Sequence, residues 1–139
     1  MRRAVLVLVA VALSLTGVQP ALAIMQFNKV FIDEYIKDHQ DKEFAEYVEK
    51  KVKCFVCHQG KKKSNHNPYG EQLHKLLDKK EDKDNVEKIR AALENVGKMH
   101  SDPKDPKSPT YAELIAAGKL PGGSLEDSQK EPAEGGEAE

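Results

Sequence analysis

The sequence of 139 residues predicts a small all-α domain. From residue 41 onward, apolar residues recur at intervals of three and four, which places them on one face of a helix. Asp, Thr and Gly residues stand where such helices would begin and end. One domain is expected at this length, and its core is marginal because aromatic residues make up only 6% of the chain. A disulfide or a large buried prosthetic group would help to stabilise it.

The first 23 residues have the pattern of a secretory signal peptide. Arg2 and Arg3 precede an apolar run at residues 4 to 15, and Ala-Leu-Ala at 21 to 23 fits a cleavage site. The run is too short for a stable membrane span. We therefore expect a soluble, exported protein in a periplasmic or other extracytoplasmic location.

The segment 24–41 is expected to form an N-terminal arm, in which VFIDEYI fits either a strand-like arm or an opening helical turn. Asp41 can cap the first clear helix. This helix is expected to run directly into the cysteines. Its apolar face is formed by Phe44, Tyr47, Val48, Val52 and Phe55.

Three further helices are expected within the domain at 42–121. The second begins near Tyr69, after a polar loop. The third is capped by Asp84 and ends at Gly97. The fourth begins with a capping box at Thr110 and is short.

Charge is unevenly distributed along the chain. The 22 basic and 23 acidic residues nearly balance, but residues 122–139 contain six acids and one lysine. This segment is poor in apolar residues, so we expect a disordered acidic tail. Lysines surround the cysteines and form a solvated face that can steer an acidic redox partner. Neither a nucleic-acid partner nor a membrane span is expected. The lysines are Lys50, Lys51, Lys53, Lys61, Lys62 and Lys63.

The only two cysteines, Cys54 and Cys57, are followed directly by His58. A disulfide oxidoreductase would normally place such a pair after a strand, and no strand pattern is present here. A structural zinc site would need a second pair of ligands, which the other histidines do not form. A structural disulfide would close a very short loop and stabilise little. These three readings remain alternatives.

Covalent haem attachment explains the motif better. Cys54 and Cys57 would form thioethers to the haem vinyl groups, and His58 would bind the iron as proximal ligand. About one helical turn places both sulfurs and the imidazole on the same side of the porphyrin. The motif therefore predicts one covalent haem c, which would also add apolar area to the core.

The stretch CFVCH, followed by QGKKK and NPYG, resembles the small exported bacterial monohaem c-type cytochromes. The segment MHSDPKDPKSPTYAELIAAGKLPG is similar to the closing part of such proteins. The resemblance covers about residues 42 to 121. It implies a cytochrome c-like helical domain wrapped around one haem, and electron transfer. Cys54, Cys57 and His58 are the residues it carries over.

Several residues compete to be the second axial ligand of the iron. Met99 is the first choice, because it precedes a late proline-rich loop and methionine is a usual ligand in electron carriers. His100 is the runner-up, since it would continue the apolar face of the third helix beyond Gly97. His66 and His74 are weaker candidates, and an open site is the remaining alternative.

The sequence shows no substrate pocket and no acid–base pair, so we do not expect an enzyme. The expected function is periplasmic electron transfer. The alternative is a haem-based gas or redox sensor, or a peroxidase-like protein with an open distal site. Tyr69 and Gly70 fit contacts with haem or an ordinary turn equally well.

Overall fold

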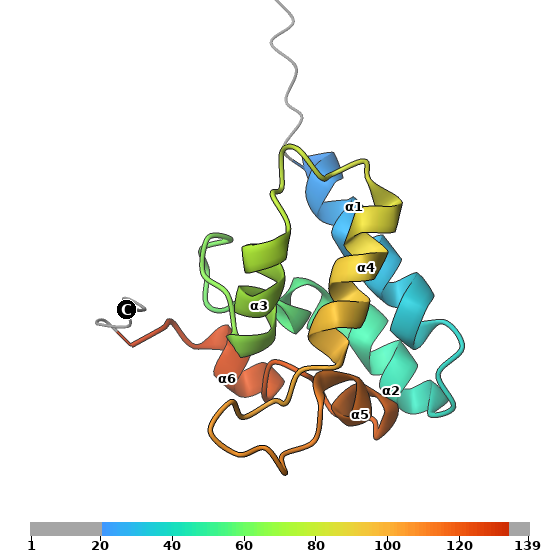
Figure 1. Ribbon diagram of the computed structural model, residues 1–139, viewed down its shortest axis with the longest axis vertical. Helices are drawn as coiled ribbons and strands as arrows, with labels where there is room; N and C mark the ends of the chain where they lie inside the picture. Colours follow the sequence, from blue (N-terminus) through green and yellow to red (C-terminus); the bar gives the residue numbers. More distant parts are fainter. Residues whose placement is uncertain (1–20, 134–139) are drawn as a thin grey trace, which may run out of the picture.

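Every regular element in the computed structural model is helical over residues 21–133, the part of the chain that the structure describes (Figure 1). The only strand-like features in this range are two isolated β-bridges, His58 with His66 and His100 with Thr110. The prediction of an all-α domain is confirmed. No helix between residues 21 and 133 is long and apolar enough to cross a membrane.

The first helix, α1 (Ala21–Phe31), continues into a π-helical turn, η1 (Ile32–Ile36). It lies alongside α4 (Val86–Gly97), as Figure 1 shows. The Tyr35 hydroxyl donates to the Leu93 carbonyl across this contact at 3.0 Å. The segment expected to be an arm is therefore helical and packed into the domain. Most of the predicted signal peptide, residues 1–20, lies outside the described residues.

Ile36 tests this packing because it is fully buried at the end of η1. We expect Ile36→Ala to lower the free energy of unfolding by about 2–5 kcal/mol, the usual cost of truncating a buried isoleucine. Urea unfolding of the haem-free protein measures this. A loss below about 0.5 kcal/mol, typical of surface positions, would show that the segment is a loose arm after all.

The helix before the cysteines begins where predicted and then changes type. Asp41 caps α2 (Lys42–Tyr47), accepting a hydrogen bond from the Phe44 amide at 2.9 Å. A π-helical turn, η2 (Val48–Val52), and a 3₁₀ turn, η3 (Lys53–Val56), follow. Cys54 therefore lies on a tight 3₁₀ turn rather than on a continuing α-helix, and Cys57 and His58 follow directly after this turn.

The later helices also agree closely with the sequence. Asn67 caps α3 (Pro68–Leu76). Asn85 caps α4, one residue later than the predicted Asp84, and α4 ends at Gly97.

The capping box at Thr110 is present at the start of α5 (Tyr111–Ala116). The helix is followed by Gly118 with φ of +70°, a conformation that favours glycine. Both features agree with the prediction for the fourth helix.

The structure differs from the sequence prediction in the expected acidic tail. Instead of disorder from residue 122, it contains a helix, α6 (Leu125–Gln129), capped by Ser124. Ser128 is buried with 2% exposure, and Leu125 packs against the core. Residues 122–133 are thus part of the folded domain. Residues 134–139 lie outside the described range.

Candidate functional site

The backbone of the Cys-x-x-Cys-His motif forms a closed turn. The Cys54 carbonyl accepts hydrogen bonds from the amides of Cys57 at 3.2 Å and His58 at 3.0 Å. Both cysteines are free and partly exposed. The turn thus brings two unpaired thiols and an imidazole together within five residues.

The structure favours one orientation of His58. Its Nδ1 atom lies 3.3 Å from the Asn65 carbonyl oxygen. When Nδ1 donates to this carbonyl, Nε2 keeps its lone pair and can bind a metal. Burial, and next the neighbouring His66, lower the pKa of His58. The imidazole is therefore neutral near pH 7, as a metal ligand must be.

Two other histidines stack on the same side of the motif. The ring centroids of His58 and His66 lie 5.2 Å apart, and His74 stacks on His66 with ring centroids 4.7 Å apart. Rings in such contact leave no room for a porphyrin between His58 and His66. In this arrangement His66 is therefore not placed as a ligand on the opposite face, and the ring contact of His74 is with His66.

The two leading candidates for the sixth ligand lie where α4 ends. Met99 is 43% exposed, and its backbone carbonyl accepts from the Tyr111 amide at 3.0 Å. His100 is also exposed, and its Nδ1 atom lies within hydrogen-bond distance of the Ser108 carbonyl. The structure does not bring either side chain into contact with the motif through a hydrogen bond or ring contact in the described range.

Although Cys57 is partly exposed as a residue, protein atoms surround its thiol, and this desolvation raises the pKa of the thiol to about 12, with Cys54 as the second cause. A catalytic thiol needs the thiolate form, and its pKa is normally lowered rather than raised. The Cys57 thiol is therefore protonated near pH 7 and is a poor nucleophile in this environment.

We expect this environment to slow alkylation of Cys57. In the native haem-free protein at pH 8, iodoacetamide should modify Cys57 more than about tenfold more slowly than in the urea-unfolded chain, because less thiolate is present. Peptide mass mapping at timed intervals measures the rate. Equal rates in the two states would show that the thiol is not protected.

Tyr69 is fully buried beside the motif. Its ring packs against those of Tyr111 and Phe31, with ring centroids 5.2 Å and 6.2 Å apart, respectively. Burial raises the pKa of Tyr69 well above its usual value, and the second cause is Cys57. Among residues 21–133 the Tyr69 hydroxyl has no hydrogen-bond partner, which is unusual for a buried phenol. This leaves one buried donor free next to the motif.

Gly70 approaches the motif more closely than any larger residue could. A Cβ atom at this position would lie 1.9 Å from the Cys57 carbonyl oxygen. The N-terminal turn of α3 is therefore packed directly onto the motif. Both Tyr69 and Gly70 thus have tertiary contacts beyond an ordinary turn.

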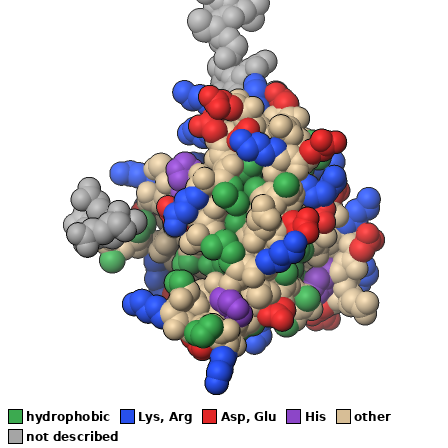
Figure 2. All heavy atoms as spheres, viewed as in Figure 1, with side chains coloured by type: hydrophobic (Ala, Val, Ile, Leu, Met, Phe, Trp, Pro, Cys, Tyr) green, Lys and Arg blue, Asp and Glu red, His purple; other side chains and the backbone are tan. Residues whose placement is uncertain are grey.

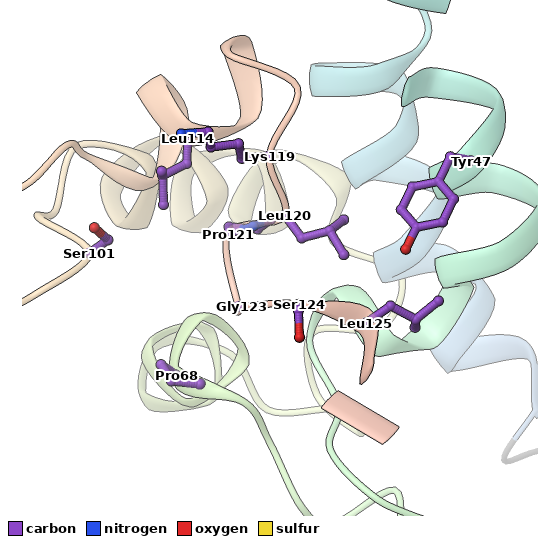
Figure 3. Close-up of a pocket in the computed structure, with 11 residues that line it drawn as sticks. Tyr47, Pro68, Ser101, Leu114, Lys119, Leu120, Pro121, Gly123, Ser124 and Leu125 are labelled. Carbon is purple, nitrogen blue, oxygen red and sulfur yellow. The ribbon is translucent and has the colours of Figure 1, made fainter. Parts of the chain in front are cut away.

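A groove of about 640 Å³ lies beside the first residue of α3, Pro68 (Figure 3). In this view Tyr47 and Leu125 lie at one end, Ser101 and Pro68 lie at the other, and Leu120 lies between them. The lining is mainly apolar, and it does not include Cys54, Cys57 or His58; its remaining members are Leu114, Lys119, Pro121, Gly122, Gly123 and Ser124.

The loop after the motif is basic and exposed. Lys61, Lys62 and Lys63 all face solvent, as predicted. The C-terminal segment contacts the same loop: the Lys61 amide donates to the Glu131 carboxylate at 3.1 Å. Figure 2 shows basic and acidic side chains interspersed on the face that it presents. The basic loop is thus a local feature beside an acidic segment.

The donor set fits a covalently attached haem. It offers two free thiols at the required spacing and a histidine whose Nε2 is available. The partnerless Tyr69 hydroxyl adds a buried donor beside them. Sequence reasoning had identified these residues, but it missed Asn67, which bonds to the carbonyls inside the motif. The Asn-Pro at residues 67–68 is a helix-start signal that could have shown the cap.

Comparison with known protein families, with curated proteins and with solved structures finds no match.

Proposed function

We propose that this protein is an exported electron carrier with one covalently attached haem c. The observation that carries the proposal is the closed turn with two free thiols, followed by a histidine whose Nδ1 faces the Asn65 carbonyl. Bound haem iron would supply a one-electron couple without any proton transfer by the protein.

Each residue of the motif has a role in this proposal. Cys54 and Cys57 anchor the group through thioether bonds. His58 binds the iron through Nε2, while its bond to the Asn65 carbonyl fixes the ring orientation. The exposed lysines 61–63 offer a docking face for an acidic redox partner.

The exposure of Met99 supports a second candidate function. The Met99 side chain is 43% exposed, so the protein does not pack it in place as a ligand for an iron centre held by His58. A site without a firm sixth ligand suits a haem-based gas or redox sensor, or a peroxidase-like protein.

Carbon monoxide separates these two functions. The protein is produced with haem-attachment machinery, reduced, and scanned before and after addition of carbon monoxide. A spectrum that does not change, together with a reversible one-electron couple at an electrode, supports the electron carrier. A shifted spectrum moves the sensor or peroxidase-like function to first place. A Met99→Ala variant that gains carbon monoxide binding would identify Met99 as the sixth ligand.

A further inference from the structure

Asn67 bonds to the segment between the two cysteines. Its side-chain Nδ2 donates to the carbonyls of Phe55 at 3.0 Å and Val56 at 2.9 Å. Its Oδ1 accepts from the Gly70 amide at 2.9 Å. The residue is only 1% exposed, so these bonds are sheltered from water. Phe55 and Val56 are the two residues that separate the cysteines in the sequence.

The backbone of Asn67 adds a third bond to the motif. Its amide donates to the Cys57 carbonyl at 2.9 Å. The Cys54 carbonyl is already bonded to the amides of Cys57 and His58. Every carbonyl from Cys54 to Cys57 therefore has a partner, and Asn67 supplies the partner for all but the first.

The chain enters the motif in a strained conformation. Lys53 has φ of +51°, and it is the only non-glycine residue in the described range with a positive φ. Such a conformation costs free energy and persists only where the surroundings fix it. The bonds from Asn67 to Phe55, Val56 and Cys57, which begin two residues after Lys53, contribute to that constraint.

The C-terminal segment closes over the Asn67 side chain. A Cβ atom at Gly122 would lie 2.1 Å from Asn67 Nδ2. Ser128, in α6, accepts a hydrogen bond at its carbonyl from the Gly60 amide at 2.8 Å. Residues 122–128 therefore help to exclude water from the bonds that Asn67 makes.

We propose that Asn67 is a positioning residue that fixes the Cys-x-x-Cys turn in the haem-free protein and so presents both thiols for attachment. The consequence for attachment rests on the proposed function. An ordinary N-cap needs only a side-chain oxygen, as Asn85 shows by accepting from the Lys88 amide at 3.0 Å. The two Nδ2 bonds into the motif go beyond capping.

The test compares Asn67→Ser with Asn85→Ser in the full chain. Serine is as good an N-cap as asparagine, so both variants keep their helix cap. Only Asn67→Ser removes the donors to Phe55 and Val56. Ile36→Ala serves as the stability control, because it weakens the fold without touching the motif.

Two readouts are measured. In the haem-free protein, the amide protons of Cys57 and His58 should exchange with solvent about tenfold faster in Asn67→Ser, because two hydrogen bonds that hold the turn are lost. Asn85→Ser should leave these rates unchanged. When produced with attachment machinery, the fraction of Asn67→Ser chains carrying covalent haem should fall at least about threefold, whereas Asn85→Ser and Ile36→Ala should match the wild type.

Unchanged exchange at Cys57 and His58 in a folded Asn67→Ser protein would overturn the inference. If the wild type carries covalent haem, a haem fraction in Asn67→Ser that is no lower than that in Ile36→Ala would also overturn the inference. A wild type without covalent haem would instead defeat the proposed function, and the exchange rates would still decide the role of Asn67.

A second measurement applies if Asn67→Ser does not fold. In the wild-type haem-free protein, the side-chain amide protons of Asn67 should exchange more slowly than those of Asn95, which is exposed on α4. Equal rates would mean that Nδ2 does not hold the turn, and the inference would be wrong.

Discussion

Replacing both Cys54 and Cys57 with alanine is expected to abolish covalent haem. Each thiol can form one thioether, so each single variant should retain a single attachment and the double variant none. A haem stain on a denaturing gel measures this, because only covalently bound haem stays with the unfolded chain. The proteins are produced with haem-attachment machinery.

Two further variants test the role of His58 as the proximal ligand. His58→Ala should keep the covalent attachment but lose the iron's proximal ligand, so its reduced spectrum should differ from that of the wild type. His39→Ala is the matched control, because His39 lies outside the motif, is not a candidate ligand of the iron, and bonds through Nε2 to the Ile115 carbonyl at 2.8 Å. A haem stain that survives in the double cysteine variant would overturn the assignment of both cysteines.

Gly70→Ala is expected to destabilise the protein strongly. The new Cβ would lie 1.9 Å from the Cys57 carbonyl oxygen, so the backbone of either α3 or the motif must shift. We expect a loss of about 3 kcal/mol in the free energy of unfolding, near the upper end of the usual cost of overpacking. Urea unfolding of the haem-free protein measures it.

The sign of this effect is informative, because helix propensity alone predicts the opposite. Glycine within a helix costs about 1 kcal/mol relative to alanine, so without the contact Gly70→Ala would stabilise α3. Lys75→Ala on the exposed side of the same helix is the control and should change stability by less than about 0.5 kcal/mol. A stabilised Gly70→Ala protein would show that α3 does not press against the motif.

Local signals in the sequence predicted the helices well. Asp41 and the capping box at Thr110 act on amides within the next three residues, so the helix starts could be found without tertiary information. The cap of α4 is Asn85 rather than the predicted Asp84. This difference of one residue is also local, since both side chains can cap a helix. The cysteine motif was equally visible because its residues are adjacent.

Tertiary contacts decided what the sequence could not show. Segment 24–41 looked like an arm because its short apolar pattern fits a strand or a helix, and only the contact with α4 settles it. Composition predicted disorder after residue 122, but Leu125 and Ser128 pack against the rest of the domain. Asn67 was missed because two of its partners precede it by eleven and twelve residues.

The central claim is that Cys54 and Cys57 bind haem covalently. The most direct measurement is the intact mass and the reduced absorption spectrum of wild-type protein produced with haem-attachment machinery, followed by treatment with iodoacetamide. We predict one haem per chain, a haem c spectrum, and no alkylation of either cysteine after unfolding. A chain without added mass, in which iodoacetamide modifies both cysteines, would contradict the account. The two cysteines would then be assigned to a disulfide, a redox pair or a metal site.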